Sequence, residues 1–323
     1  MRAKILVTRE VYEETLEFLG HQFDVTANQG DELWDADKLA QMAAGKEGLM
    51  TSSSDKIDAA LLARCPQLKA VCNIAVGYNN IDLAACSERG IMATNTPGVL
   101  TESTADFTWA LMLAAARRVA ESERWLRAGN WKRVRLKDFP GVDVNHATLG
   151  IIGMGRIGQA VARRARGFDM KVLYHDQARI SDTLEQQCNA SYVSKEDLLR
   201  DSDFVTLHLP YAPENHHAIG AEELARMKRT AVLLNVARGG IVDDAALVAA
   251  LKSGTIAAAA LDVFENEPQL NPALLELSNV VLSPHIGSAS DSTRRRMAML
   301  AAENLVAALT TGNAPNLLNP KPV

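Results

Sequence analysis

The stretch LGIIGMGRIG, residues 149–158, decides the fold of this chain. Its apolar first half predicts a buried strand, and apolar residues at helical spacing follow it at Ile157, Val161 and Ala165. The G-x-G-x-x-G pattern of Gly153, Gly155 and Gly158 therefore lies at a strand-to-helix turn. At such a turn a pyrophosphate group meets free N–H groups and the positive end of a helix dipole. The stretch therefore predicts a Rossmann-type nicotinamide dinucleotide site.

Each glycine has its own part in this prediction. Gly153 makes the tight turn, Gly155 lets the backbone approach the phosphates, and Gly158 lets the helix pack closely on its strand. Arg156 and Ile157 lie between the last two glycines and are expected to contact the cofactor as well.

An acidic residue follows the next predicted strand. Asp176 comes after residues 171–175, about where the dinucleotide fingerprint expects an acid that binds the adenine ribose. Asp176 therefore favours NAD(H) over NADP(H). Two alternatives stay open: a turn-forming role for Asp176, and receipt of a 2′-phosphate by Arg179.

Length and composition limit the class of protein. A chain of 323 residues with 47% hydrophobic residues is expected to form two domains. The net charge is -5, and the sequence has no long run of charges of one sign. This argues against nucleic acid or a membrane as partner and favours a small substrate. The longest apolar run, residues 109–116, is too short to span a bilayer, and residues 1–7 are too short for an export signal.

The cysteines indicate neither a disulfide framework nor a metal site. Cys65, Cys72, Cys86 and Cys188 form no C-x-x-C pair, and none has a histidine at zinc-finger spacing. We expect inert thiols and a cytoplasmic location.

Strand-like and helix-like segments alternate in two series, which predicts an α/β fold with two parallel sheets. The first series has strands at residues 5–7, 48–51, 69–72 and 91–93. The second has six, at residues 148–152, 171–175, 204–209, 232–235, 257–262 and 280–283. Between the series, residues 101 to about 127 predict one long helix whose first half is buried.

Three downstream segments resemble the D-isomer-specific 2-hydroxyacid dehydrogenase family: NVARGG (235–240), DVFENEP (262–268) and PHIGS (284–288). AVGYNNID (75–82) extends the resemblance towards the N-terminus. The resemblance implies a flavodoxin-like substrate domain, residues 1–99 and 288–323, and an inserted NAD-binding Rossmann domain, residues 100–287. It also implies Arg238, Glu267 and His285 as the catalytic set.

The chemistry of reducing a 2-oxo acid explains these residue types. The cofactor supplies a hydride, and His285 can give a proton to the carbonyl oxygen. Glu267 is expected to hold His285 charged and to raise its pKa, and Arg238 can grip the substrate carboxylate with two donors. All three lie just past strand ends, where α/β sheets bind their ligands. By resemblance, the N–H groups of Val76 and Gly77 hold the carboxylate too.

The resemblance also implies further contacts to the cofactor, at His208, Pro210, Val236, Ala237, Arg238, Asp262, His285 and Gly287. His208, His216 and His217 form a group of histidines near the end of one predicted strand. A metal site is the alternative interpretation of this group. We expect no metal there, because these histidines lack a carboxylate or a cysteine at ligand spacing.

The subgroup is indicated by TPGVLTESTAD (96–106) and AARR (115–118), which look most like bacterial glyoxylate and hydroxypyruvate reductases, a group that overlaps with 2-ketogluconate reductases. Many of those enzymes favour NADPH and lack an acid at the strand end. Asp176 departs from that pattern, because it favours NAD(H). The resemblance implies a homodimer joined by the long helix, with residues 131–141 reaching towards the partner. An NAD(H)-sensing binding protein, like the transcriptional corepressors of this fold, is the alternative function.

Overall fold

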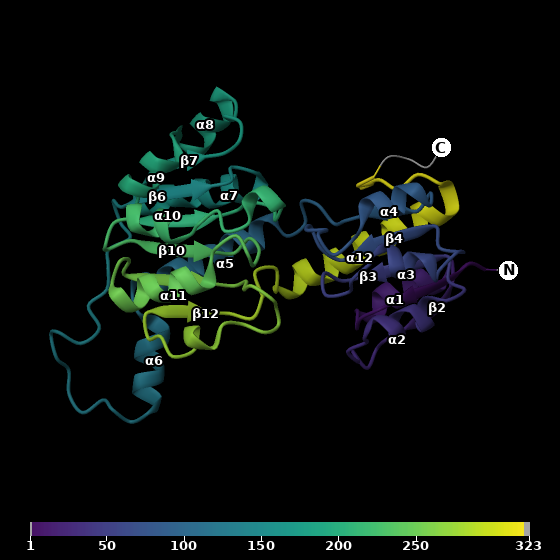
Figure 1. Ribbon diagram of the computed structural model, residues 1–323, viewed down its shortest axis with the longest axis horizontal. Coiled ribbons are helices and arrows are strands. Elements are labelled where there is room, and N and C mark those ends of the chain that lie inside the picture. The colour runs from purple at the N-terminus through teal and green to yellow at the C-terminus, as the bar shows by residue number, and fades with distance from the viewer. Residues whose placement is uncertain (1, 320–323) are drawn as a thin grey trace. The chain divides into compact units, whose positions relative to one another are not determined.

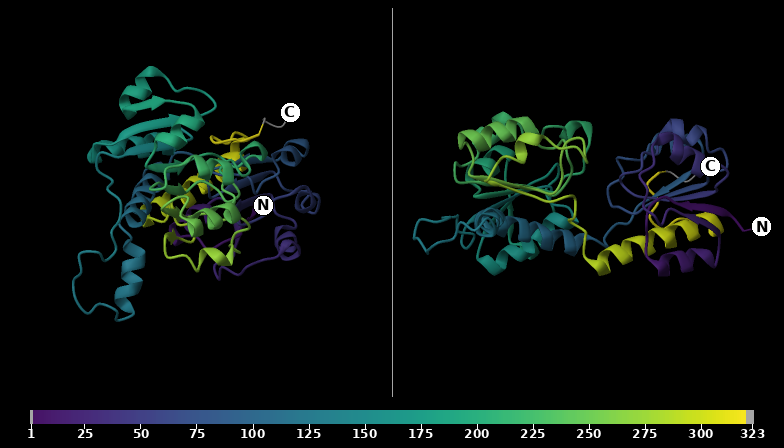
Figure 2. Two further views of the ribbon diagram at one scale, coloured as in Figure 1. Left: turned by 60° about the vertical axis from the view of Figure 1, so that its left-hand side comes forward. Right: turned by 90° about the horizontal axis from the view of Figure 1, so that it is seen from below.

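The computed structural model describes residues 2–319 of the chain. The chain folds into two compact units, Met1–Leu100 with Ala289–Val323, and Thr101–Ser288. Each unit is a parallel β-sheet with helices on both faces, as Figure 1 and Figure 2 show. The chain leaves the first unit once and returns to it, so the second unit is an insertion.

The first unit contains a five-stranded sheet in the order β2-β1-β3-β4-β5. Its strands are β1 (Lys4–Val7), β2 (Asp24–Ala27), β3 (Gly48–Thr51), β4 (Ala70–Asn73) and β5 (Met92–Thr94), and all pairs are parallel. This is the flavodoxin-like order, which confirms the predicted fold class. The sequence did not predict β2, because this edge strand is only partly buried and has no apolar run.

The helices of the first unit are α1 (Glu13–Gly20), α2 (Ala36–Ala43), α3 (Ala59–Ala63), α4 (Leu83–Glu88) and α12 (Asp291–Thr311). Side chains that can accept hydrogen bonds begin four of them: Asp35, Asp58, Asp82 and Ser290 each accept a bond from a backbone N–H in the first turn. Helix α12 packs on β3 and β4, so the last part of the chain completes a core begun by the first part.

The second unit contains a seven-stranded parallel sheet in the order β12-β11-β10-β9-β6-β7-β8. The strands are β6 (Thr148–Ile152), β7 (Lys171–His175), β8 (Ala190–Tyr192), β9 (Phe204–Leu207), β10 (Val232–Asn235), β11 (Ala258–Leu261) and β12 (Val280–Leu282). Six predicted strands are present, and the order is that of a doubly wound dinucleotide-binding sheet with one more strand. The expectation of six was one short, because β8 is a three-residue edge strand with little apolar sequence.

The helices of the second unit are α5 (Thr101–Ala116), α6 (Val119–Arg127), α7 (Arg156–Ala165), α8 (Asp182–Cys188), α9 (Lys195–Asp201), α10 (Ala221–Arg226) and α11 (Asp244–Ser253). Neighbouring strand residues point to opposite faces: Ile151 joins the core under α5 and α7, and Ile152 joins the core under α9 and α11. Both faces of the sheet are therefore covered.

The predicted single helix over residues 101–127 is wrong. The chain forms α5 and α6, and the break falls at Arg118, which has a φ of 52° and an ion pair of 2.8 Å with Glu121. A left-handed residue cannot continue an α-helix, so α6 turns away from the axis of α5. The burial predicted for the first half is confirmed, since Trp109 stacks on Phe168 with ring centroids 4.8 Å apart.

All four cysteines are buried and unpaired. Within residues 2–319, no helix combines the length and the apolar composition needed to cross a membrane.

Candidate active site

The glycine-rich turn joins β6 to α7. Gly153 has a φ of 97°, and a Cβ there would lie 2.7 Å from the backbone of His208. A Cβ on Gly158 would lie 2.2 Å from the carbonyl oxygen of Gly153, so only glycine lets α7 approach the turn this closely. A Cβ on Gly155 would meet nothing within 4 Å. The chain itself therefore leaves the space beside Gly155 open, as close approach of a phosphate requires.

Asp176 lies at the end of β7 and points back to this turn. Its Oδ2 accepts a hydrogen bond of 2.7 Å from the N–H of Met154, between the first two glycines. The carboxylate is therefore held beside the glycine-rich turn, and its contact with the adenine ribose stays a prediction.

The alternative partner for a cofactor phosphate, Arg179, is already engaged. Its guanidinium donates to both carboxylate oxygens of Glu185, at 2.8 and 2.7 Å, and Glu185 also accepts a bond of 2.6 Å from the hydroxyl of Tyr174. The Arg179 hydrogen bond lowers the pKa of Glu185 to about 2, with help from Tyr174. An anion that binds the remaining donors of Arg179 would share its positive charge with Glu185.

Other predicted cofactor residues lie where β9 and β10 end. Burial lowers the pKa of His208 to about 3, and its Nε2 lies 3.1 Å from the hydroxyl of Thr206. Pro210 is exposed beyond it, whereas Val236 and Ala237 are buried. His208 is thus a neutral ring that borders the sheet edge.

Arg238 follows β10 in a loop that Asn235 organises. The Asn235 side chain donates to the carbonyl of Arg238 at 3.0 Å and accepts from the N–H of Ala237 at 3.1 Å. A Cβ on Gly239 would lie 1.7 Å from the carbonyl oxygen of Phe264, so this loop is pressed against the segment that carries Glu267. Burial lowers the pKa of Arg238, while the charge of Glu267 opposes that shift. The arginine remains a cation because its ordinary pKa is so high.

His285 and Glu267 form a direct pair. The Nδ1 of His285 lies 2.7 Å from Oε2 of Glu267, and Oε1 of Glu267 accepts a bond of 2.8 Å from the N–H of Phe264. Burial opposes ionisation of Glu267, but the hydrogen bond and charge of His285 outweigh it and lower the pKa of the carboxyl. The side chains are 39% and 32% exposed, so a substrate can reach the imidazole.

Asp262 holds the turn that carries His285. This carboxylate is 1% exposed and accepts bonds from the hydroxyl of Ser283 and from the N–H groups of Ile286 and Gly287, all at 2.7–2.8 Å. Asp262 thus acts as a positioning residue for the turn, and its contact with a cofactor stays a prediction. Sequence reasoning assigned no role to Ser283 or Asn235, although a polar residue that ends an apolar strand is a usable signal for such roles.

Val76 and Gly77 belong to the first unit, in the loop after β4. Their carbonyl oxygens accept bonds from the side chains of Asn95, at 2.7 Å, and Asn73, at 2.9 Å. No residue in the described range 2–319 accepts a bond from the N–H group of either one. The loop is thus held with two donors unpaired.

The expectation that the histidine group lacks a carboxylate was wrong for His217. Its Nε2 lies 2.5 Å from Oε1 of Glu265, far away in the sequence but adjacent at the sheet edge. His216 lies beside it, and His208 is not a member of this group of side chains. Strand order brings the loops after β9 and β11 together, which ligand spacing along the sequence cannot show.

The doubly wound sheet, its glycine cradle and the acid at the end of β7 define a dehydrogenase that uses a nicotinamide dinucleotide. Residues 109–287 match the D-isomer specific 2-hydroxyacid dehydrogenase family, NAD binding domain. The chain belongs to this family, as its motifs indicated, and is an NAD(P)-dependent D-2-hydroxyacid dehydrogenase.

Relatives resemble the chain over nearly its whole length. It is 49% identical to glyoxylate reductase of Aeropyrum pernix, with 98% of this chain and 96% of the relative covered. It is 46% identical to glyoxylate reductase of Pyrococcus horikoshii, with 99% of this chain and 96% of the relative covered. The fold also matches a solved structure of the NADPH-dependent glyoxylate/hydroxypyruvate reductase of Sinorhizobium meliloti, in complex with NADP and malonate. The TM-score is 0.87 and the sequence identity is 36%, with 98% of this chain and 97% of that chain covered.

Proposed function

We propose that this enzyme reduces a small 2-oxo acid of the glyoxylate or hydroxypyruvate type to the D-2-hydroxy acid, with a preference for NADH. The observation that carries the proposal is the 2.7 Å pair of His285 and Glu267 in a segment adjoining the loop of Arg238. An acid, its anionic partner and a cation for a carboxylate are the groups that this reduction needs. The names of the relatives support the same substrate class.

The residues divide the work of the reaction as follows. The bound nicotinamide supplies the hydride that the carbonyl carbon receives. His285 donates the proton of Nε2 to the carbonyl oxygen, since Nδ1 is taken by Glu267. Glu267 remains anionic and stabilises the imidazolium before the transfer. Arg238 binds the substrate carboxylate. In the first unit, the N–H groups of Val76 and Gly77 have no acceptor within residues 2–319 and stay predicted donors to a carboxylate.

Two contacts support the preference for NADH. Asp176 is held at the glycine turn, where its charge suits ribose hydroxyls and repels a 2′-phosphate. Arg179 already has its Nε and Nη2 donors on Glu185, so its charge is partly neutralised before any 2′-phosphate binds.

The test is a spectrophotometric assay with NADH and NADPH against glyoxylate, hydroxypyruvate, 2-ketogluconate and larger 2-oxo acids. We expect the two smallest substrates with NADH to give the highest kcat/KM. A higher kcat/KM for 2-ketogluconate would reassign the substrate, and a higher value with NADPH would refute the role of Asp176. No cofactor oxidation with any 2-oxo acid would favour the NAD(H)-sensing binding protein.

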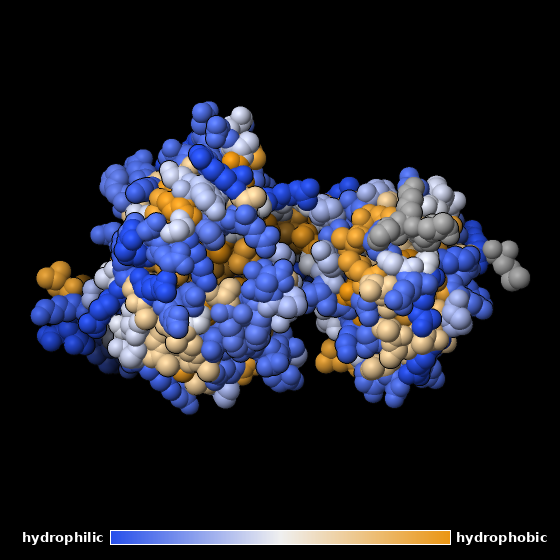
Figure 3. All heavy atoms as spheres, turned by 45° about the horizontal axis from the view of Figure 1, so that its top comes forward, coloured by the Kyte–Doolittle hydropathy of each residue, from blue (hydrophilic) through white to orange (hydrophobic). Residues whose placement is uncertain are grey.

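We also propose that the enzyme is a homodimer built on α6 and the loop after it. Helix α6 has no buried residue, and large apolar side chains are uncovered here: Val119, Leu126, Trp131, Val134 and Leu136. Figure 1 shows α6 and this loop standing away from the sheet of their unit, and apolar atoms project at the same extremity in Figure 3. Such a surface is typical of an interface between subunits.

The four buried, unpaired cysteines suit a reducing compartment such as the cytoplasm.

A further inference from the structure

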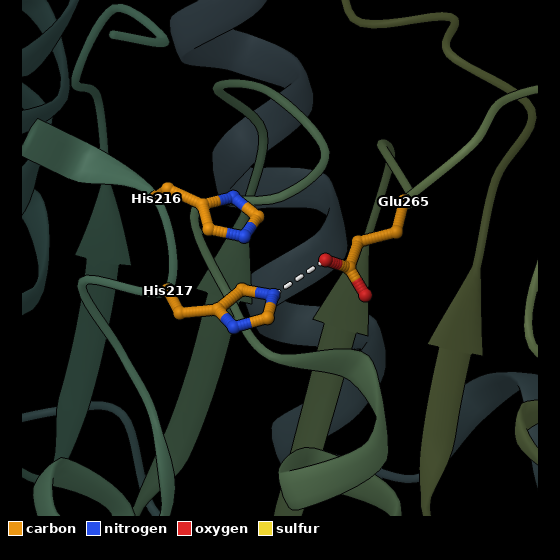
Figure 4. Close-up of side chains that lie close together, drawn as sticks. All are labelled: His216, His217 and Glu265. Atoms are coloured by element: carbon orange, nitrogen blue, oxygen red, sulfur yellow. Dashed lines mark hydrogen bonds and ion pairs between the residues drawn. The ribbon is translucent and has the colours of Figure 1, made fainter. Parts of the chain in front are cut away.

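Two histidines and a glutamate that have no part in the proposed reaction meet at one edge of the seven-stranded sheet. His216 and His217 lie in the loop after β9, and Glu265 lies in the loop after β11. Figure 4 shows the three side chains converging from these loops. One nitrogen of each histidine and one carboxylate oxygen all lie within 4.8 Å of one another.

The contacts around His217 hold it in place for this arrangement. Its Nε2 lies 2.5 Å from the Glu265 carboxylate, and its Nδ1 lies 3.9 Å from the carboxylate of Asp243. Its backbone N–H donates to the carbonyl of Gly240 at 2.8 Å. Glu265 thus lies at Nε2 as a second candidate ligand, and Asp243 lies on the Nδ1 side of the ring, beyond hydrogen-bond distance.

His216 adds a second nitrogen from the same loop. Its ring stacks on that of His217, with centroids 3.9 Å apart, and its Nδ1 lies 3.3 Å from the hydroxyl of Tyr211. If Nδ1 keeps that contact, Nε2 is left for another partner. The side chain is exposed, so it can rotate without disturbing a core.

We propose that His216, His217 and Glu265 form a binding site for a divalent transition metal of the zinc type. Two imidazole nitrogens and one carboxylate suit Zn²⁺, Co²⁺ or Ni²⁺, whereas Mg²⁺ and Ca²⁺ require oxygen ligands. Ligand atoms on a tetrahedral zinc ion lie roughly 3.3 Å apart. The 2.5 Å contact between His217 and Glu265 would therefore open as the metal enters, and rotation of the exposed His216 ring would bring its nitrogen closer. Water would fill the open coordination position.

A metal in this site would tie together two loops that border the Arg238 loop. His217 is hydrogen bonded to Gly240, and Gly239 is pressed against Phe264 next to Glu265. The metal ligands are distinct from His285 and Glu267, so the site adds to the catalytic centre rather than replacing it. Metal binding should therefore raise the melting temperature of the folded enzyme.

The experiment is a titration of the full-length, metal-stripped enzyme with Co²⁺, followed by its visible absorption and by competition with Zn²⁺. We expect one saturable equivalent per chain, displaced by Zn²⁺ and unaffected by excess Mg²⁺. H216Q and E265Q should each weaken Co²⁺ binding by about tenfold or more. Because His216 is exposed, H216Q should keep the metal-free melting temperature of the wild type but lose most of the rise that Zn²⁺ causes.

Two controls separate this site from other histidines. H21Q changes an exposed histidine of the first unit, and H285Q changes the other histidine that is paired with a carboxylate. Both should bind Co²⁺ like the wild type. The proposal is overturned if binding does not saturate, if H216Q and E265Q bind as tightly as the wild type, or if H285Q weakens binding as much as they do.

Discussion

The Nδ1 of His285 lies 2.7 Å from Oε2 of Glu267, which leaves Nε2 as the nitrogen available to a substrate. We predict that His285 is the proton donor. H285Q should lower kcat for glyoxylate reduction by roughly 10²-fold or more, because an amide cannot donate the proton as an imidazolium does. Fluorescence titration should show NADH binding within about threefold of the wild type, a change below about 1 kcal/mol. Near-normal turnover would remove His285 from the mechanism.

The charge of Glu267 should govern the pH dependence. Its lowered pKa means that the pair is intact above the ordinary glutamate value of about 4.3 and is lost as the pH falls through the lowered value. E267Q keeps a hydrogen-bond acceptor but removes the carboxyl group that titrates. The acid limb of the kcat/KM profile that reports Glu267 should therefore be lost. An unchanged limb in E267Q would show that the charge is not needed.

Cofactor choice should depend on Asp176. D176N removes the charge that repels a 2′-phosphate, so the ratio of kcat/KM with NADH to that with NADPH should fall by about tenfold or more. D182N is the matched control, since Asp182 is an exposed acid close to Arg179 that does not contact the glycine turn. If D176N and D182N lowered this ratio equally, cofactor choice would depend on the general electrostatic field of the acidic residues and not on a specific contact of Asp176 with the cofactor.

Two glycine variants should separate folding from cofactor binding. A Cβ on Gly158 would meet the carbonyl of Gly153 at 2.2 Å, so G158A should unfold at lower denaturant, with a loss of about 1–3 kcal/mol. A Cβ on Gly155 meets open space, so G155A should be as stable as the wild type but bind NADH at least about tenfold more weakly. Normal NADH binding by G155A would contradict the predicted position of the pyrophosphate.

The oligomeric state should depend on the apolar surface of α6 and its loop. Light scattering should give the mass of a dimer, and a variant with both Leu126 and Trp131 changed to Ser should shift towards monomer. These side chains are 52% and 57% exposed in the single chain, so their loss should cost little within one subunit. Y192S changes an exposed apolar side chain elsewhere in the same unit and serves as the control. A monomeric wild type would contradict the proposal.

Much of the fold could be read from short windows of sequence. Strands β6, β7 and β10 begin and end where the sequence predicted, because each has an apolar buried centre bounded by a polar residue at one or both ends. Strands β2 and β8 were missed because edge strands bury less and carry weaker patterns. The break at Arg118 was missed because no glycine or proline marks it.

By itself, the sequence determined the glycine-rich turn, the two α/β series and the family, and it predicted Arg238, Glu267 and His285 as the catalytic set. These depend on residue types at fixed local spacing, which chain geometry translates directly into turns and strand ends. Tertiary structure alone decided which side chains meet: Arg179 with Glu185, Asp262 with the His285 turn, and His217 with Glu265. The pair of His217 and Glu265 is far apart in the sequence. It forms because strand order, and not distance along the chain, decides which loops meet at the carboxyl edge of the sheet.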